Sequence, residues 1–302
     1  MSTEAALPEQ RPSALVTNGS IAVMCLVWGS TWLVIREGLD DVPPFTSAAV
    51  RFLLAGVAMG VLYAFVGAKE GGKAPATWLW VVLGLTNFAA SYGIVYRTET
   101  ILPSGLVALL WGVFPMLMAL ASHFYLPGEK LRSAQWLGFV FGFLGLALLF
   151  ITDLRKFGPE GVPAALFLFL SPVVSAVGNI LVKKYGEKTN SMAMNRNGML
   201  LGGVVLGVVA LATERGADAH WTRGAIFSVA YLAFLGTVLT FGLYFWLLRY
   251  VDAHKLSLIA YVTPAIALTL GPLVRGEPMT RNTAAGAACI LCGVVLVVRR
   301  RH

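Results

Sequence analysis

Two stretches of the chain decide the fold: ALLWGVFPMLMAL (108–120) and SLIAYVTPAIALTL (257–270). Both are apolar, and both carry a proline midway, Pro115 and Pro264, which lie 149 residues apart. Three further pairs follow at a separation of 148: Glu129 with Glu277, Gly138 with Gly286, and Gly145 with Gly293. Because these separations are close to half of the 302 residues, the sequence indicates a tandem duplication.

Composition places this duplicated chain in a membrane. Hydrophobic residues make up 57% and charged residues only 13%, against roughly a quarter charged in an ordinary soluble domain. This excludes a disordered chain, a disulfide scaffold and a typical cytosolic enzyme. The net charge of +8 comes from basic residues scattered between apolar runs, which suits lipid headgroups rather than nucleic acid. The three cysteines lie inside apolar runs and indicate no disulfide framework.

Apolar runs of membrane-spanning length recur along the whole chain. A helix needs about 20 such residues to cross a hydrocarbon core, and barrel strands would alternate instead of running apolar throughout. We therefore expect an all-α integral membrane protein with ten transmembrane helices. The expected spans are 19–38, 45–67, 76–97, 103–125, 132–152, 160–183, 192–212, 222–248, 255–274 and 281–299.

Basic residues predict the orientation. With both termini in the cytoplasm, the inner segments hold 13 Lys and Arg residues and the outer loops hold 8, which follows the positive-inside tendency. The expected units are a cytoplasmic tail (1–18), a first repeat (19–152) and a second repeat (160–299). Because each repeat has an odd number of spans, the second copy must insert upside down, as in many secondary transporters.

One segment carries a family resemblance. WGSTWLVIREGLDDVPPFTSAAVRFLLAG (28–56), together with the apolar-Pro-Gly-Glu pattern of each half, resembles the drug/metabolite transporter superfamily and its EamA repeat. Within that superfamily the sequence is similar to YddG-type amino-acid exporters. The resemblance implies ten helices, inverted five-helix repeats and export of small metabolites. The second half reads SAVGN (175–179) in place of the tryptophan motif, so the first helices of the two repeats differ chemically.

Uncharged polar and aromatic residues in the spans are candidates for a substrate cavity. Ser171, Ser175 and Asn179 fall on one helical face, and the repeat aligns Ser175 and Asn179 with Trp28 and Trp32. The alternative is plain interhelical hydrogen bonding. The candidate cavity residues are Trp28, Trp32, Asn87, Ser91, Tyr92, Tyr96, Trp111, Ser175, Asn179, Thr240, Tyr244 and Tyr261.

The positions of prolines and acidic residues predict where helices bend and how transport is driven. Pro115 and Pro264 are expected hinges, with fixed kinks as the alternative. All acidic residues fall in loops or at helix ends, so we expect movement down a gradient rather than proton-driven transport. Arg51 lies near the outer end of its span and is expected to reach the interface as an anchor.

The combined prediction is a secondary transporter of the inner (cytoplasmic) membrane, not an enzyme. It would export neutral or zwitterionic metabolites, amino acids including aromatic ones, by alternating access through a central cavity. A channel, or a membrane-embedded enzyme acting on lipid, is the alternative. Expected partners are the small-molecule substrate and membrane lipids. We expect no cofactor, metal or nucleic acid, and a monomer.

Overall fold

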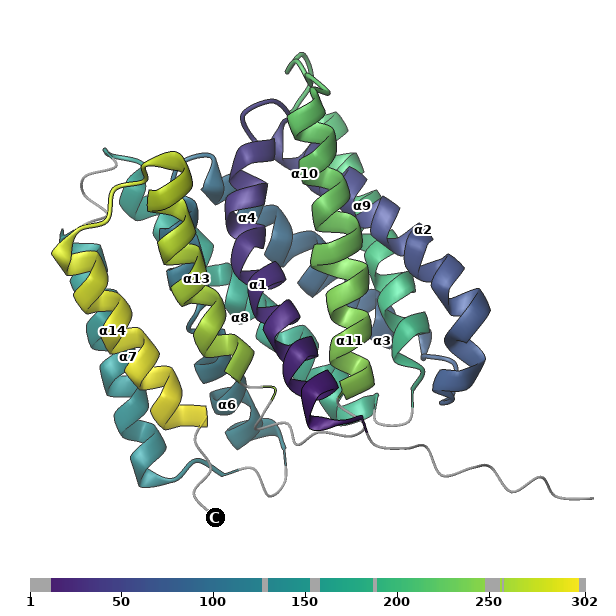
Figure 1. The fold of residues 1–302 in the computed structure, drawn as a ribbon, viewed down its shortest axis with the longest axis horizontal. Helices are drawn as coiled ribbons and strands as arrows, with labels where there is room; N and C mark the ends of the chain where they lie inside the picture. The colour runs from purple at the N-terminus through teal and green to yellow at the C-terminus, as the bar shows by residue number, and fades with distance from the viewer. Residues whose placement is uncertain are drawn as a thin grey trace, which may run out of the picture.

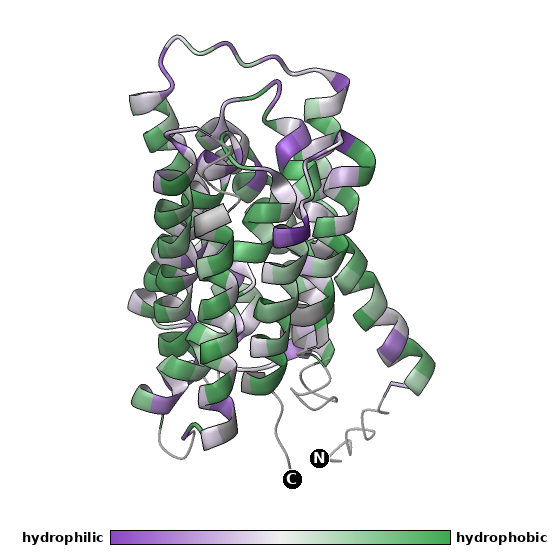
Figure 2. Cartoon of the chain, turned by 90° about the vertical axis from the view of Figure 1, so that its left-hand side faces the viewer, coloured by the Kyte–Doolittle hydropathy of each residue, from purple (hydrophilic) through white to green (hydrophobic). Residues whose placement is uncertain are grey.

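The computed structural model describes residues 12–126, 130–152, 158–186, 189–247, 256 and 258–298. Within these ranges the regular elements are helices, apart from one isolated bridge between Lys73 and Thr189. Apolar residues line the helices, and hydrophilic residues gather mostly towards the two ends of the bundle (Figure 2). A lipid core favours this architecture because a helix satisfies its own backbone hydrogen bonds.

The helices of the first half coincide with the five predicted spans. Two spans are divided: the third runs through a π-helical segment, η1, and the fourth is interrupted after Trp111. The helices pack into one bundle (Figure 1). The elements are α1 (Ala14–Gly38), α2 (Pro44–Glu70), α3 (Thr77–Leu83), η1 (Gly84–Ser91), α4 (Tyr92–Glu99), α5 (Ser104–Trp111), α6 (Phe114–Tyr125) and α7 (Ser133–Thr152).

The second half repeats this series. Its third span is again divided by a π-helical segment, η3, but the helix that carries Pro264 is continuous. The elements are α8 (Gly161–Tyr185), α9 (Ser191–Thr213), α10 (Arg223–Ala233), η3 (Phe234–Leu239), α11 (Thr240–Leu247), α13 (Leu258–Arg275) and α14 (Arg281–Val298).

Length and hydropathy qualify seven helical segments of the described chain as membrane spans. Three more apolar helices are shorter: Gln135–Leu149, Val262–Arg275 and Arg281–Leu296. The protein is therefore an all-helical, multi-pass membrane protein.

Helices α2 and α9 form a symmetric antiparallel pair. A Cβ atom on Gly56 would come within 2.7 Å of Leu200, and one on Gly203 within 2.9 Å of Leu53. The two contacts are equivalent in the repeat: Leu200 lies 147 residues after Leu53, and Gly203 lies 147 residues after Gly56. Small residues thus let the helices approach closely.

The carboxylates at the ends of α2 and α9 cap each other's helix. Glu214 accepts hydrogen bonds from the backbone N–H groups of Phe45 (2.7 Å) and Thr46 (2.9 Å) at the start of α2. At the opposite end, Glu70 accepts from the N–H groups of Ser191 (2.9 Å) and Met192 (3.0 Å) at the start of α9. Each carboxylate accepts hydrogen bonds from backbone N–H groups that have no partner within their own helix, and its negative charge complements the positive end of the helix dipole.

Helices α7 and α14 pack by the same rule. A Cβ atom on Gly145 would lie 2.7 Å from the carbonyl oxygen of Gly286, and one on Gly293 would lie 2.5 Å from that of Gly138. The repeat alignment pairs these glycines, and the structure brings them into contact crosswise. Glu129, which the alignment pairs with Glu277, lies outside the described residues.

Candidate substrate site

A group of uncharged polar side chains joins α8 to η1. Asn87 Oδ1 accepts hydrogen bonds from Ser175 Oγ (2.5 Å) and from Asn179 Nδ2 (2.7 Å). Close approach is possible because Gly178 faces Thr86 and Asn87 without a side chain. We call Asn87, Ser91, Trp111, Ser171, Ser175 and Asn179 the amide–hydroxyl cluster.

The second part of this cluster adds an indole from α5. Ser171 Oγ donates to the carbonyl oxygen of Ser91 (3.0 Å), and it lies 2.8 Å from Ser91 Oγ. Trp111 Nε1 donates to Ser171 Oγ at 3.0 Å, while its ring lies 6.0 Å from that of Trp32 on α1. The predicted face of Ser171, Ser175 and Asn179 therefore turns towards η1, with Trp111 and Trp32 beside it.

The π-helical segments help to create the site. In the repeat alignment, Ser91 at the end of η1 corresponds to Thr240 directly after η3, 149 residues later. Asn87 and Ser91 come from η1, and Thr237 comes from η3. π-helical turns occur frequently at functional sites because they shift side chains out of the ordinary helical register. The sequence did not reveal these segments.

Trp28 contacts residues of the second half. Its Nε1 donates to the carbonyl oxygen of Gly236 at 3.2 Å, an oxygen that also accepts from Thr240 Oγ1 at 3.0 Å. Its ring lies 6.0 Å from Tyr244 and 5.7 Å from Phe241. The side chain of Tyr261 lies outside the described side chains.

Arg51 does not reach an interface, and this expectation was wrong. Its side chain is buried, with 1% of the residue exposed. Nη1 donates to Tyr96 Oη at 3.3 Å, and Nη2 donates to Thr237 Oγ1 at 3.3 Å. Its Cζ atom lies 4.8 Å from the ring centre of Tyr92 and 5.1 Å from that of Phe52, within cation–π range.

These partners of Arg51 are all neutral. We call Arg51, Phe52, Tyr92, Tyr96 and Thr237 the guanidinium cluster. A chain of ring contacts connects it to Trp28, through Phe88 and Phe241: the centroid distances are 4.8 Å (Phe52–Tyr92), 5.4 Å (Phe52–Phe88), 6.3 Å (Phe88–Phe241) and 5.7 Å (Phe241–Trp28). The buried cation is therefore contacted by two predicted residues of the first repeat, Tyr92 and Tyr96, and by Thr237 of the second repeat, which the sequence did not single out.

One of the acids at a helix end does not reach water. Glu99 is indeed the last residue of α4, yet it is 0% exposed. Among the described residues, neither of its carboxylate oxygens has a hydrogen-bond partner. Sequence position placed Glu99 at a helix end, where acids normally meet water. Only the packing of other elements over that end, which a single sequence does not display, buries it.

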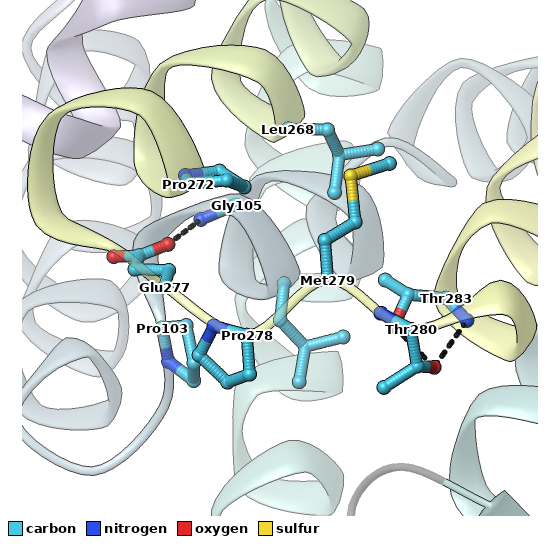
Figure 3. A pocket seen from close by; sticks show the side chains of 10 residues that line it. Pro103, Gly105, Leu268, Pro272, Glu277, Pro278, Met279, Thr280 and Thr283 are labelled. Atoms are coloured by element: carbon cyan, nitrogen blue, oxygen red, sulfur yellow. Dashed lines mark hydrogen bonds between the residues drawn. The ribbon is translucent and has the colours of Figure 1, made fainter.

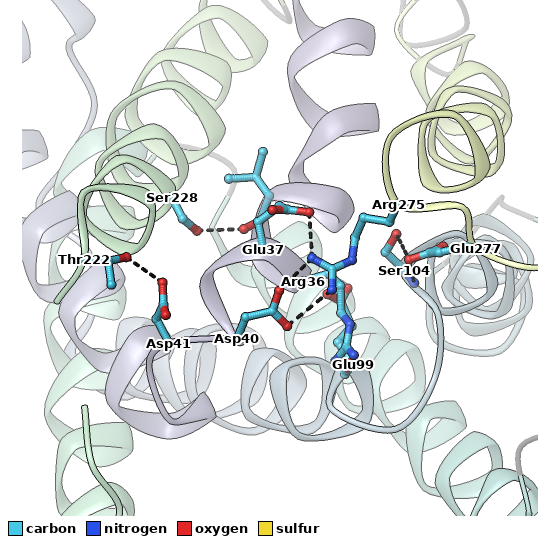
Figure 4. A network of polar contacts seen from close by, with 11 residues as sticks. Arg36, Glu37, Asp40, Asp41, Glu99, Ser104, Thr222, Ser228, Arg275 and Glu277 are labelled. Carbon is cyan, nitrogen blue, oxygen red and sulfur yellow. Dashed lines mark hydrogen bonds and ion pairs between the residues drawn. The ribbon is translucent and has the colours of Figure 1, made fainter. Parts of the chain in front are cut away.

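Polar contacts link several elements at this end of the bundle (Figure 4). Arg275 at the end of α13 forms ion pairs with Glu37 (2.7 Å), in the last turn of α1, and with Asp40 (2.8 Å), two residues after that helix ends. Asp41 accepts from Thr222 Oγ1 at the start of α10, at 2.5 Å. We call these residues the end network; together they join α1, α10 and α13.

Glu277 lies at the same end of the bundle. It comes shortly before α14 in the sequence, but its carboxylate bonds a different helix. Its Oε1 accepts from the N–H and Oγ of Ser104, both at 2.9 Å, and its Oε2 accepts from the N–H of Gly105 at 3.1 Å. The carboxylate therefore caps α5, in the other half of the chain. A pocket of about 150 Å³ opens beside it, lined by Pro103, Leu268, Pro272 and Met279 among others (Figure 3). None of the predicted cavity residues lines this pocket.

Comparison with known proteins identifies the family. Residues 18–151 and 162–299 each match the model of the EamA-like transporter family. The uncharacterized transporter YoaV of Bacillus subtilis (strain 168) is 26% identical over 93% of this chain and 96% of its own length. The uncharacterized inner membrane transporter YedA of Escherichia coli (strain K12) is 28% identical over 94% and 91%.

Two further proteins are similar over most of the chain. Protein PecM of Dickeya dadantii (strain 3937) is 28% identical over 90% of this chain and 88% of its own length. A solved crystal structure superposes with a TM-score of 0.68 at 20% identity, covering 94% of this chain and 98% of that one. At that identity the superposition establishes the fold.

Names of the matched family and relatives describe transporters rather than enzymes. Their full-length coverage and the apolar helices agree with a multi-pass protein of the inner membrane. The chain belongs to the EamA-like transporter family.

Proposed function

We propose that this protein is a secondary transporter that exports small neutral or zwitterionic metabolites, amino acids including aromatic ones among them. The proposal is supported by two polar clusters that each join the two repeats: Asn179 donates to Asn87 in the amide–hydroxyl cluster, beside the Trp32–Trp111 ring pair, and Arg51 donates to Thr237 in the guanidinium cluster. Amide, hydroxyl and indole groups orient polar ligands, and the surrounding rings suit an apolar side chain.

Arg51 sharpens the substrate class. A buried guanidinium with neutral partners offers its positive charge to a carboxylate. Its bonds to Tyr96 and Thr237, at 3.3 Å, are long, so a substrate carboxylate can replace them with stronger ones. This favours a zwitterionic amino acid over a neutral drug or a nucleoside.

Alternating access is the proposed mechanism. In this scheme all ten helical segments cross the membrane, the repeats (19–152 and 160–299) are inverted, and both termini lie in the cytoplasm. The antiparallel pair of repeat-related helices, α2 and α9, supports this because inverted repeats exchange conformations between two end states. The end network then closes the outer side.

Counterflow in proteoliposomes tests the substrate and the mechanism together. Vesicles preloaded with L-phenylalanine should accumulate labelled L-phenylalanine, whereas a channel would only equilibrate it. Excess L-phenylalanine should compete, and phenethylamine, which lacks the carboxylate, should compete much less. Equal competition by the two would contradict the assigned role of Arg51.

Site variants locate the pathway. Asn179→Ala removes an amide that bonds Asn87 at 2.7 Å and should weaken L-phenylalanine binding by about tenfold, roughly 1.4 kcal/mol. Asn197→Ala is a matched control on α9, outside the cluster. If both variants bind as the wild type does, the amide–hydroxyl cluster is interhelical packing and not a cavity wall.

A further inference from the structure

Unlike the three acids of the end network, which bond Arg275 or Thr222, Glu99 has no hydrogen-bond partner on its carboxylate among the described residues. In Figure 4 it lies beside Arg36, whose Nη1 donates at 2.6 Å to the Glu99 main-chain oxygen and not to its carboxylate. A buried carboxylate without a hydrogen bond is strongly disfavoured when ionised. Burial without a hydrogen bond therefore favours the neutral, protonated form of the Glu99 side chain in this conformation.

Among the described residues, the charged groups around Glu99 do not hydrogen-bond its carboxylate. Arg36, Arg51 and Glu277 are the charged side chains whose fields reach it, and Tyr96 also interacts with it. Arg51 is bonded to Tyr96 and Thr237, and Glu277 caps α5. Arg36 and Arg51 attract a negative charge on Glu99 from a distance, but among the described residues none donates a hydrogen bond to its buried carboxylate.

Opening the end network would change that environment. Separation of α13 from α1 at the ion pairs of Arg275 would admit water to the layer that holds Arg36 and Glu99. Water would solvate a carboxylate, and Arg36 and Arg51 would attract it. The closed end thus favours the acid form of Glu99, and the open end favours the ionised form.

We propose that Glu99 is a proton-binding site that couples opening of this end of the transporter to proton release. On opening, the O–H bond of the carboxyl group breaks, the proton passes to the entering water and the negative charge stays on Glu99. Proton binding and closure stabilise each other, so the closed form is favoured at low pH and the open form as pH rises. The proposal rests on alternating access in the proposed function but not on the identity of the substrate.

The position of Glu99 favours a gate over a proton carrier. It is the last residue of α4, and its main-chain oxygen accepts a hydrogen bond from Arg36, the neighbour of Glu37 in the end network, so it lies near one end of the bundle. A proton carried across the membrane would need access from both ends, whereas a gate needs access from one.

Distance measurements between spin labels test this gate directly. Labels at Arg223→Cys and Asn282→Cys, at the exposed starts of α10 and α14, would report separation at this end. Cys25, Cys289 and Cys292 would be replaced by serine or alanine. In liposomes without substrate, the wild-type distances should shift to longer values between about pH 5 and pH 8.5, with the open-to-closed ratio changing by at most about tenfold per pH unit for one proton.

Variants separate Glu99 from other acids. Glu99→Gln, which cannot ionise, should keep the low-pH distances at every pH, and Glu99→Asp should restore a pH-dependent shift. Glu160→Gln alters an exposed acid at the start of α8 and should behave as the wild type. A wild-type pH shift in folded Glu99→Gln, or distances in the wild type that ignore pH, would overturn the proposal.

The outcome is independent of the substrate assignment. If L-phenylalanine counterflow fails while the pH-dependent shift depends on Glu99, the proposed substrate is wrong and the gate stands. If counterflow succeeds without such a shift, the transporter assignment stands and the proton site is wrong.

Discussion

The two proline-bearing helices of the repeat differ in shape although their prolines match. The first is interrupted at Gly112 and Val113, between α5 and α6, just before Pro115. The second, α13, passes through Pro264 without a break. A proline alone therefore does not decide whether a transmembrane helix is interrupted.

The residue three positions before each proline explains part of the difference. Gly112 stands in the first helix where Tyr261 stands in the second. A Cβ atom on Gly112 would lie 3.0 Å from the carbonyl oxygen of Leu109 and 3.4 Å from Pro264 Cγ. The break of one helix therefore packs against the proline of the other.

The far ends of these helices differ as well. Arg275, at the end of α13, forms ion pairs with Glu37 and Asp40. Its counterpart in the first repeat, 149 residues earlier, is Leu126, which cannot form such a pair. One end of the bundle thus has an ionic tether that the repeat-related position at the other end lacks.

Filling the space at Gly112 should have the largest effect. Gly112→Leu would force a side chain into the contact with Pro264, and overpacking of this kind costs about 1–3 kcal/mol. We expect a lower Tm in detergent and loss of transport. Gly19→Leu is the control, because nothing lies within 4 Å of a Cβ atom there; equal Tm values for the two variants would show that the break is not packed against Pro264.

Restoring a backbone donor should slow exchange between states. Pro115→Ala returns an N–H group and favours a continuous helix, so counterflow should fall by about three- to tenfold, roughly 0.7–1.4 kcal/mol in the barrier. L-phenylalanine binding should change less. If the repeats exchange shapes, Pro264→Ala should slow counterflow to a similar degree, whereas a wild-type rate in either variant would identify that proline as a fixed structural feature.

Removing the ionic tether should have the smallest effect. Partly exposed ion pairs contribute up to about 1 kcal/mol, so Arg275→Gln should shift the spin-label distances towards the open form by a few-fold at most. Salt should weaken the wild-type tether in the same direction. Arg281→Gln, an exposed basic residue at the start of α14, should leave the distances unchanged.

The sequence predicted those features of the fold that depend on the length of the apolar runs and on the internal repeat. The apolar helices of the described chain and the crosswise glycine contacts follow from apolar length and repeat spacing. It did not supply the burial of Arg51 and Glu99, because both lie close to helix ends, where charge normally meets water. Their burial depends on which neighbours pack over them, as do the π-helical segments and the break at Gly112. The roles of the cavity residues and of the hinges remain predictions.

The mutual capping of α2 and α9 has a consequence for biosynthesis. Glu214 follows the N–H groups that it caps at the start of α2 by 168 and 169 residues. At about 5–20 residues per second, the start of α2 waits about 10–30 s on the ribosome for its acidic partner. Glu70, by contrast, has already been made when α9 emerges. The second half of the chain therefore inserts against a prepared partner, whereas the first half must persist incomplete until the second half is synthesised.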